Sequence, residues 1–378
     1  MQLPDLLSPQ ERSAELHAFE QTRSGREKPG RYWRIDLETL APSAAATVAG
    51  GVTIENSHAR AIACDLQTAA KQHAHLLARA FRAAIEPRQK FAHLALANCG
   101  LGAFIYIPAD CAFDQPIVVR YHAEANQAIY PYTVVLAERG ARATIVERLD
   151  VGSNAFVTGV AEIVTGDSAD VTYASAQIAP DDARVLFTRA ARPGRDARVA
   201  WASADLGGAL SVSDISIVIE EPGADAQIGA LFFPSGSQHV DIMSSIDHRV
   251  GDSTSDTLVK SAATDRGQGR YLGNIRIAAL AQRSDASLRD DALLLSEGAH
   301  IDSVPALEIA ANDVKAYHGA TVGALDDESI FYMTTRGIER AQAERMIALG
   351  FFEPAIDRFP TESLREELRA ALQAKVTT

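Results

Sequence analysis

The feature of this sequence that most constrains its fold is a glycine-spaced repeat in the middle of the chain. The pattern G-x-x-A-x-[IV] begins at Gly140, Gly166, Gly194 and Gly223. A degenerate fifth copy begins at Gly251, with Thr254 in place of the alanine, and the intervals between copies are 26, 28, 29 and 28 residues. A nearly fixed period of this size is typical of architectures built from stacked repeats.

Each copy of the repeat predicts a turn followed by a strand. The small and the branched residue of the pattern are two positions apart, so both lie on one face of a strand. If like positions stack, alanine lies over alanine, and Val171, Val199 and Ile228 form one interior column. A single coil has no adequate core, and stacking at roughly 4.8 Å per layer builds a continuous apolar interior. The repeat therefore predicts a mainly β fold with a β-solenoid core.

An antiparallel β-sandwich is the main competing fold. Short alternating runs such as FIYIP, PIVVRYHA and DVTYASAQI are typical of strands in either architecture. The recurrence of alanine at one place in each turn favours the solenoid.

A helical region is predicted on the N-terminal side of this core. In DLQTAAKQHAHLLARAFRAAIEP, apolar residues recur at three- and four-residue steps. This pattern predicts one amphipathic helix that ends at Pro87, with His73 as a core or boundary residue. Upstream, Tyr32 and Trp33 are expected to pack in a short extended segment.

A second helical region is predicted at the C-terminal side. Asp326 or Asp327 can cap a helix start, and TESLREELRAALQA places leucines one turn apart, which predicts a final amphipathic helix. We expect three divisions: an N-terminal helical or mixed region at 1–98, a β-helix core at 99–324 and a C-terminal helical domain at 325–378.

Composition argues against several classes of protein. The formal charge of −13 argues against nucleic-acid binding, which needs clustered Lys and Arg. Cys64, Cys99 and Cys111 form no CxxC pair, so we expect structural thiols rather than a disulfide framework or a zinc site. No apolar run has the length of a signal peptide or a membrane span, so we expect a cytoplasmic protein without a membrane partner.

The sequence carries few motifs for catalysis. It contains no GxxxxGK[ST], so we do not expect the chain to hydrolyse ATP by itself. The run GQGRYLG at 267–273 has the wrong spacing for a dinucleotide site, and its glycines are interpreted as turn residues. Polar residues in QHVDIMSSIDH either bind a metal or alternate on a solvent-facing strand. These residues are His239, Asp241, Asp247 and His248.

A carbohydrate-active β-helix enzyme is the alternative function from a different class. Asp285, Asp290 and Asp291 are its candidate carboxylates, because glycoside hydrolysis uses paired carboxyl groups. Aspartates in turns and at coil edges are the commoner explanation of such a cluster.

Three segments near the C-terminus resemble the SufB/SufD family of iron–sulfur cluster assembly scaffolds. They are LLLSEGAHIDSVPALEI at 293–309, NDVKAYHGATVGALD at 312–326 and IFYMTTRGIERAQAERMIALGF at 330–351, in the order and spacing of the family. Weaker matches at 130–149 and 238–277 extend the resemblance towards the N-terminus. There, only RYWRIDL adds to it.

The resemblance implies a right-handed parallel β-helix flanked by helical ends, which agrees with the repeat. It also implies partners: a SufC-type ABC ATPase, docked by the C-terminal helices, and a SufB-like subunit or a second copy of the chain, paired through the end of the β-helix. The candidate ATPase-docking residues in the matching segment are Phe331, Tyr332, Arg336, Ile338, Phe351 and Phe352.

Within this family, the chain is similar to the SufD branch. The SufB branch has a cysteine after the glutamate of its P-x-x-E segment, and here Ile309 follows Glu308. The resemblance implies that His318, in HGATVG, is a candidate metal ligand at a cluster-assembly interface, with Glu308 as an oxygen or proton-handling partner. SufD proteins commonly carry cysteine two residues before this histidine, and Ala316 excludes thiol chemistry there. Lys315 is interpreted as a structural or interface charge.

The leading hypothesis is a noncatalytic, SufD-like scaffold subunit for SUF-type iron–sulfur cluster assembly. The cluster is expected to be transient, with no cofactor bound tightly by the isolated chain, and FAD is a candidate component of the complex. A homodimer and a heterodimer with a SufB-like chain both remain open. A histidine that only hydrogen-bonds a turn is the competing interpretation of His318.

Overall fold

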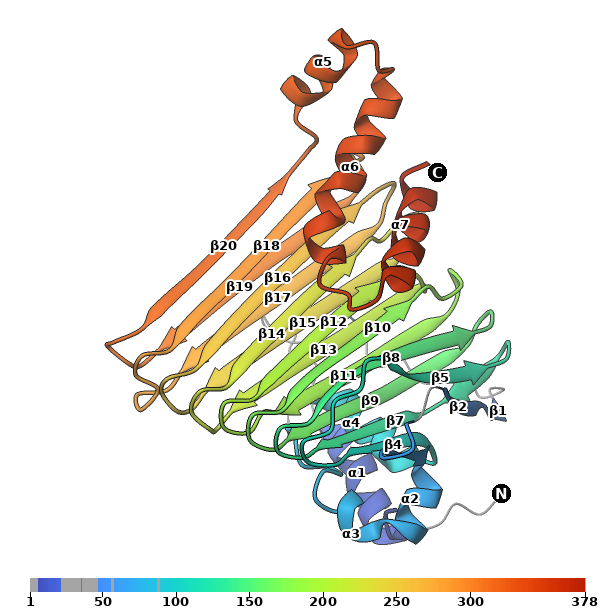
Figure 1. Ribbon diagram of the computed structural model, residues 1–378. Coiled ribbons are helices and arrows are strands. Elements are labelled where there is room, and N and C mark those ends of the chain that lie inside the picture. Colours follow the sequence, from blue (N-terminus) through green and yellow to red (C-terminus); the bar gives the residue numbers. More distant parts are fainter. Residues whose placement is uncertain (1–5, 22–34, 36–46, 56–57, 87–88, 378) are drawn as a thin grey trace.

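The computed structural model describes residues 6–21, 35, 47–55, 58–86 and 89–377. Within these residues, the chain forms a parallel β-solenoid of two facing sheets, with helices at both ends (Figure 1). The predicted fold class is therefore confirmed, and the antiparallel sandwich is wrong, because neighbouring strands of the solenoid run parallel. Only the strands at Gly51–Glu55 and Ile62–Asp65, at the N-terminal end of the described sheets, pair antiparallel.

From residue 131 onward, successive strands alternate between the two sheets, so that each coil contributes one strand to each sheet. The first sheet contains, in spatial order, β19 (His300–Ile309), β17 (Gln268–Ile277), β15 (His239–His248), β13 (Leu210–Ile219), β11 (Arg184–Arg192), β9 (Phe156–Thr165), β7 (Pro131–Ala137), β4 (Leu101–Ile107) and β3 (Ile62–Asp65), with β6 (Gln127–Ile129) and β1 (Thr47–Val48) beside it. The second sheet contains β2 (Gly51–Glu55), β5 (Ile117–Ala123), β8 (Arg142–Val151), β10 (Asp170–Gln177), β12 (Arg198–Asp205), β14 (Asp225–Phe232), β16 (Thr254–Ala263), β18 (Asp285–Leu294) and β20 (Lys315–Gly323).

The observed register agrees only in part with the register predicted from the repeat. Val171 lies opposite Val199, as predicted, and both side chains are fully buried. Ile228, however, lies opposite Trp201, while Val199 lies opposite Ala226. The predicted column of Val171, Val199 and Ile228 is therefore wrong at its third member.

The cause of this shift is that the motif glycine occupies two different positions in the turn. Gly140 and Gly223 adopt φ angles of 66° and 77°, in the left-handed region. In the copies between them, that conformation is taken two residues after the glycine, by Ser168 and Asp196. A two-residue shift leaves each side chain on its face but changes the residue on which it stacks. The alanines that stack in the turns, through backbone hydrogen bonds to the next coil, are Ala141, Ala169, Ala197 and Ala224.

The N-terminal helices are α1 (Pro9–Gln21), α2 (Leu66–Gln72), α3 (Ala74–Leu77) and α4 (Lys90–Asn98). The single helix predicted over this region is wrong, because half-buried His73 has a φ of −131° and a ψ of 28° and separates α2 from α3. Apolar periodicity does not reveal the break, since Leu66 and Leu77 on its two sides pack in one apolar cluster. Pro87, Tyr32 and Trp33 lie outside the described residues.

The C-terminal helices are α5 (Asp327–Thr335), α6 (Arg340–Ile356) and α7 (Glu362–Thr377). Asp326 caps α5, because its carboxylate accepts a hydrogen bond from the Ser329 N–H at 3.0 Å. The second half of α6 and α7 cover the outer face of the second sheet, whereas α5 projects beyond the solenoid (Figure 1). The buried helix residues include Phe352, Ile356, Leu364, Leu368 and Leu372.

Candidate functional site at the open end of the solenoid

The last coil of the solenoid is open. β19 and β20 end the two sheets, so within the described residues each has a sheet neighbour on one side. Ile277 is 0% exposed, whereas its register partner in the last coil, Ile309, is 43% exposed. Leu288 is likewise 1% exposed, whereas its partner His318 is exposed. Unpaired N–H and C=O groups on such edges are a template for another chain.

His318 lies on the inner face of β20. Its register partner Leu288 belongs to the buried interior, and Ala316, two residues earlier, packs against the same apolar cluster. In the part of the chain that the structure describes, the His318 ring makes no hydrogen bond or ion pair. An exposed imidazole that these residues leave unbonded is available as a metal ligand.

Glu308 lies on the outer face of the solenoid wall. It is in register with Arg276, and its Oε1 accepts a hydrogen bond from Asn274 Nδ2 at 2.9 Å. Alternation along β19 puts Ile309, rather than Glu308, on the inner face. The structure thus places His318 and the Ile309 position on the same inner face, and it does not bring Glu308 to that face.

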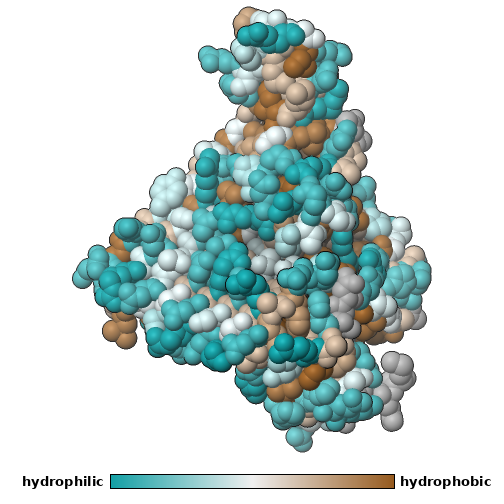
Figure 2. All heavy atoms as spheres, in the orientation of Figure 1, coloured by the Kyte–Doolittle hydropathy of each residue, from teal (hydrophilic) through white to brown (hydrophobic). Residues whose placement is uncertain are grey.

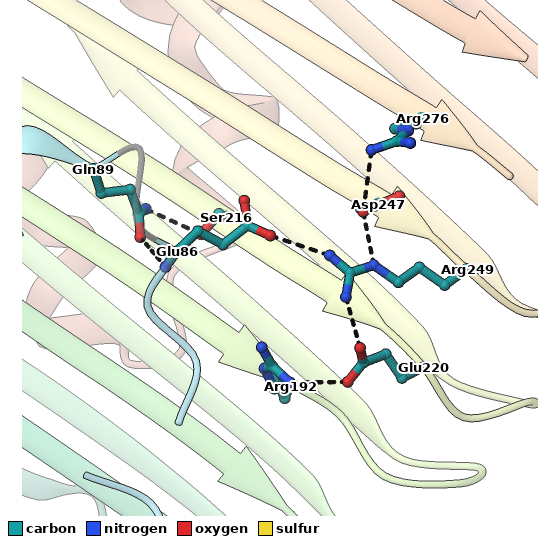
Figure 3. A network of polar contacts seen from close by, with 8 residues as sticks. All are labelled: Glu86, Gln89, Arg192, Ser216, Glu220, Asp247, Arg249 and Arg276. Carbon is teal, nitrogen blue, oxygen red and sulfur yellow. Dashed lines mark hydrogen bonds and ion pairs between the residues drawn. The ribbon is translucent and has the colours of Figure 1, made fainter. Parts of the chain in front are cut away.

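Glu308 continues a charged ladder on the outer face of the first sheet. Arg276 follows Asp247 in register, with 3.9 Å between its guanidinium and the carboxylate. Figure 3 shows that this ladder also reaches the N-terminal region through Arg249. The partners of the Arg249 guanidinium are Asp247 at 2.9 Å, Glu220 at 2.6 Å and Glu86 at 3.2 Å.

The candidate ATPase-docking residues fall into two groups. Phe331 and Tyr332 on α5 are 70% and 60% exposed, and the Arg336 guanidinium lies 3.2 Å from the Tyr332 hydroxyl. Figure 2 shows apolar residues on the surface of this projection. Phe352, by contrast, is fully buried, and its ring centroid lies 6.0 Å from that of Phe233.

Phe352 therefore anchors α6 and is not accessible for direct docking. Phe351 and Ile338 are both half-buried. The ring of Phe351 lies beneath Lys260, whose Nζ is 4.4 Å from the ring centroid. Of the six candidate residues, Phe331, Tyr332 and Arg336 are exposed.

The metal-binding hypothesis for the strand QHVDIMSSIDH is wrong. Asp241 forms a buried ion pair with Arg270, with 2.6 Å between Oδ2 and the guanidinium. His248 faces the interior, where its ring nitrogens lie 2.8 Å from the hydroxyls of Ser253 and Ser255. Burial lowers the pKa of His248 to about 4, so the ring is neutral. Among the described residues, no three His, Cys, Asp or Glu side chains are placed to hold a metal ion.

The three aspartates of the carbohydrate-enzyme alternative do not line one cleft. Asp285 is exposed at the start of β18, and Asp291 lies on the outer face of that strand. Asp290 faces the interior, where it is fully buried and accepts a hydrogen bond from the Ser303 hydroxyl. Burial raises the pKa of Asp290 to about 7. Paired glycosidase carboxylates must flank one bond from a shared cleft, which this arrangement does not provide.

The cysteines have the structural character that was expected. Cys99 and Cys111 are buried, Cys64 is half-buried, and all three are free thiols. Burial raises the pKa of Cys64 and Cys99 to about 11, which keeps both thiols protonated and unreactive at neutral pH.

Sequence reasoning missed a polar group on the outer face of the second sheet. Lys260 and Asp291 occupy the same register position on β16 and β18, and Lys260 Nζ donates to Asp291 Oδ2 over 2.7 Å. Thr321 on β20 donates to the other carboxylate oxygen, also over 2.7 Å. Lys260 and Asp291 are oppositely charged and lie about one repeat period apart in the sequence. A search of the repeat for opposite charges at this spacing could have found the pair.

No helix in the described part of the chain combines the length and the apolar character needed to cross a membrane.

Comparison with known proteins identifies the family. The model of the SufBD core domain, described as SUF system FeS cluster assembly, matches residues 119–351. The chain is 33% identical over 167 residues to the iron–sulfur cluster assembly protein SufD of Escherichia coli K12, a match that covers 44% of this chain and 40% of that protein.

Two further relatives carry the SufBD family description. One, from Staphylococcus epidermidis, is 25% identical over 304 residues, covering 79% of this chain and 65% of the relative. Another, from Mycobacterium tuberculosis, is 35% identical over 159 residues and 40% of each protein. The chain thus spans less than two thirds of the length of these relatives. Because the core-domain match covers most of the solenoid and reaches into α6, the chain belongs to the SufBD family of SUF-system iron–sulfur cluster assembly proteins.

Proposed function

We propose that this protein is a SufD-like, noncatalytic scaffold subunit that contributes His318 to a cluster-assembly interface. The observation that carries the proposal is the place of His318, which is exposed and lies on the inner face of an open coil. Its ring has no hydrogen-bond or ion-pair partner among the described residues. An imidazole in this position can ligate iron once a second subunit covers the coil.

The donor set supports a scaffold that depends on a partner. Iron–sulfur clusters are held mainly by thiolates. Ile309 and Ala316 share the inner face with His318, and neither offers a sulfur atom. The cluster is therefore cargo whose sulfur ligands come from another chain, and we expect no cofactor bound tightly by the isolated protein. FAD stays a prediction for the assembled complex.

The open coil supports pairing with a SufB-like subunit or a second copy of this chain. Exposed Ile309 and Val322 on its inner face, 43% and 45% accessible, offer apolar surface beside the unpaired strand edges. A second solenoid end can satisfy both the backbone groups and the apolar residues. Such pairing would also enclose His318.

The projecting helices support docking of an ABC-type ATPase. Phe331 and Tyr332 are large and exposed, and the cationic Arg336 lies over the Tyr332 ring. Aromatic residues and arginine are enriched among residues that dominate binding energy. Glu308, on the outer face, stays a candidate contact for a partner rather than a co-ligand of His318. The complex is proposed to act in the cytoplasm.

The test is His318→Ala, with His75→Ala as the matched control, because His75 is also exposed but lies on α3. Both variants are reconstituted anaerobically with the ATPase and a SufB-like subunit, and iron, sulfide and visible absorbance are measured. We expect His318→Ala to lower cluster yield while circular dichroism and ATPase capture stay unchanged. Equal yields from both variants, or a stable cluster on the isolated wild-type chain, would contradict the proposal.

A further inference from the structure

Asp291 uses both carboxylate oxygens to hold neighbouring strands. Its Oδ2 accepts from Lys260 Nζ over 2.7 Å and lies 2.9 Å from Arg289 Nε. Its Oδ1 accepts from the Thr321 hydroxyl over 2.7 Å. Asp291 and Lys260 are only 5% and 7% exposed. Burial raises the pKa of Asp291, but the hydrogen bonds from Lys260 and Thr321 outweigh it, so the pKa is lowered and the carboxylate is charged.

Lys260 extends this group of contacts to the C-terminal helices. Its Nζ lies 4.4 Å from the centroid of the Phe351 ring on α6. Phe351 packs edge-on against Phe352, with ring centroids 5.3 Å apart, and Phe352 is fixed in the core. The contacts thus run without interruption from α6 through β16 and β18 to Thr321 on the terminal strand.

These contacts constrain one another because the ion pair is buried. Removing one partner of a buried pair leaves an uncompensated charge, so the pair resists rearrangement. A shift of α6 that moves Phe351 also disturbs Lys260, and Lys260 shares its carboxylate with Thr321. Thr321 is three residues from His318 on the same strand.

A second group of hydrogen bonds, centred on Asp256, also links the C-terminal helices to the solenoid and serves as a control for the contacts of Asp291. Asp256 on β16 accepts hydrogen bonds from Arg358, which follows α6, and from the Ser287 hydroxyl on β18 over 2.6 Å. These hydrogen bonds link the end of α6 to β16 and β18, but they include no residue of β20.

We propose that Asp291 is a positioning residue that couples α6 to β20, so that the strand carrying His318 responds to how α6 is held. The inference rests on the proposed function in one respect, because α6 belongs to the helices assigned to ATPase docking. The coupling itself is a property of the isolated chain, and it is a free energy shared between two sites.

The first test measures amide hydrogen exchange of residues 315–323 in the isolated full-length chain. Asp291→Asn and Thr321→Val should each speed exchange in β20, by about tenfold for Asp291→Asn. Phe351→Leu keeps an apolar side chain but removes the ring beneath Lys260. Made in the wild-type protein, it should speed amide exchange in β20; added to Asp291→Asn or Thr321→Val, it should have no further effect on β20. The matched control, Asp256→Asn, should leave β20 exchange unchanged.

Thr321→Val keeps the Lys260–Asp291 pair, so it tests the last link even if Asp291→Asn fails to fold. The coupling would be overturned if Phe351→Leu and Thr321→Val speed amide exchange in β20 additively. It would also be overturned if Asp256→Asn speeds that exchange as much as Asp291→Asn does.

The second test separates this inference from the proposed function. Wild type and Asp291→Asn should capture the ABC-type ATPase equally, and capture should slow β20 exchange in wild type but not in Asp291→Asn. No capture by wild type refutes the docking proposal while the exchange data from the isolated chain still decide the coupling. Capture with equal slowing of β20 in both proteins would refute the role of Asp291.

Discussion

The buried carboxyl of Asp290 predicts an unusual pH dependence of stability. Asp290 faces the solenoid interior, its Oδ2 accepts a hydrogen bond from Ser303, and its Oδ1 has no partner among the described residues. Burial is the main cause of the raised pKa, and the neighbouring charge of Asp291 adds to it, so the pKa moves from its ordinary 3.8 to about 7. This rise in pKa corresponds to about 4 kcal/mol between the two protonation states.

The sign follows from proton linkage. The folded protein holds the Asp290 proton to higher pH than the unfolded chain does, so this stabilisation is lost as pH rises from about 4 to about 7. About 1.4 kcal/mol of the loss is expected between pH 6 and pH 8. His248 acts in the opposite direction, because burial lowers its pKa to about 4, so stability rises as pH increases from about 4 to 6.5 and levels off above that.

The Asp290→Asn variant separates the contribution of the Asp290 carboxyl to the pH dependence of stability from that of His248, because His248 is present in both proteins. Urea unfolding of both proteins at pH 6, 7 and 8 gives the free energy of unfolding at each pH. The free energy of unfolding of the variant, minus that of wild type, should increase by about 1.4 kcal/mol from pH 6 to pH 8. The absolute offset is not diagnostic, because the new amide N–H is itself buried. Parallel pH profiles for the two proteins would refute the raised pKa of Asp290.

Three further outcomes follow from the structure. Val199→Asp should lower the free energy of unfolding by about 4–7 kcal/mol, since it buries a charge at a position that is 0% exposed, and an unchanged melting temperature would contradict the interior assignment. Phe331→Asp should abolish the proposed capture of the ABC-type ATPase, and it should leave the melting temperature unchanged because Phe331 is 70% exposed. Phe352→Ala should instead cost about 3–5 kcal/mol of stability, measured by urea unfolding, and a surface-like cost below 1 kcal/mol would mean that Phe352 is not the anchor of α6.

Much of the fold could be predicted from the sequence because the repeat specifies the length of each coil and the position of its turn. The glycine-spaced pattern predicts coils, and period-two alternation predicts which residues face inward. Both hold for Val171 and Val199, which stack as expected. The resemblance around the HGATVG segment likewise led to the family that the core-domain match shows.

The register and the composition of the site were decided only by the tertiary structure. A glycine in a turn does not reveal whether it or a residue two positions later takes the left-handed conformation, so Ile228 was assigned to the wrong neighbour. The family resemblance likewise grouped Glu308 with His318, although the side chain of Glu308 lies on the outer face of the sheet.

The contacts made by Lys260 depend on the tertiary structure in the same way. Lys260, Asp291 and Thr321 are each about one coil apart in sequence, and Phe351 comes from a helix folded back onto the sheet. Local propensity describes neighbours along the chain, whereas these contacts exist only once coils have stacked and α6 has packed over them. The sequence by itself therefore determined the coil and the family, and stacking determined which side chains meet.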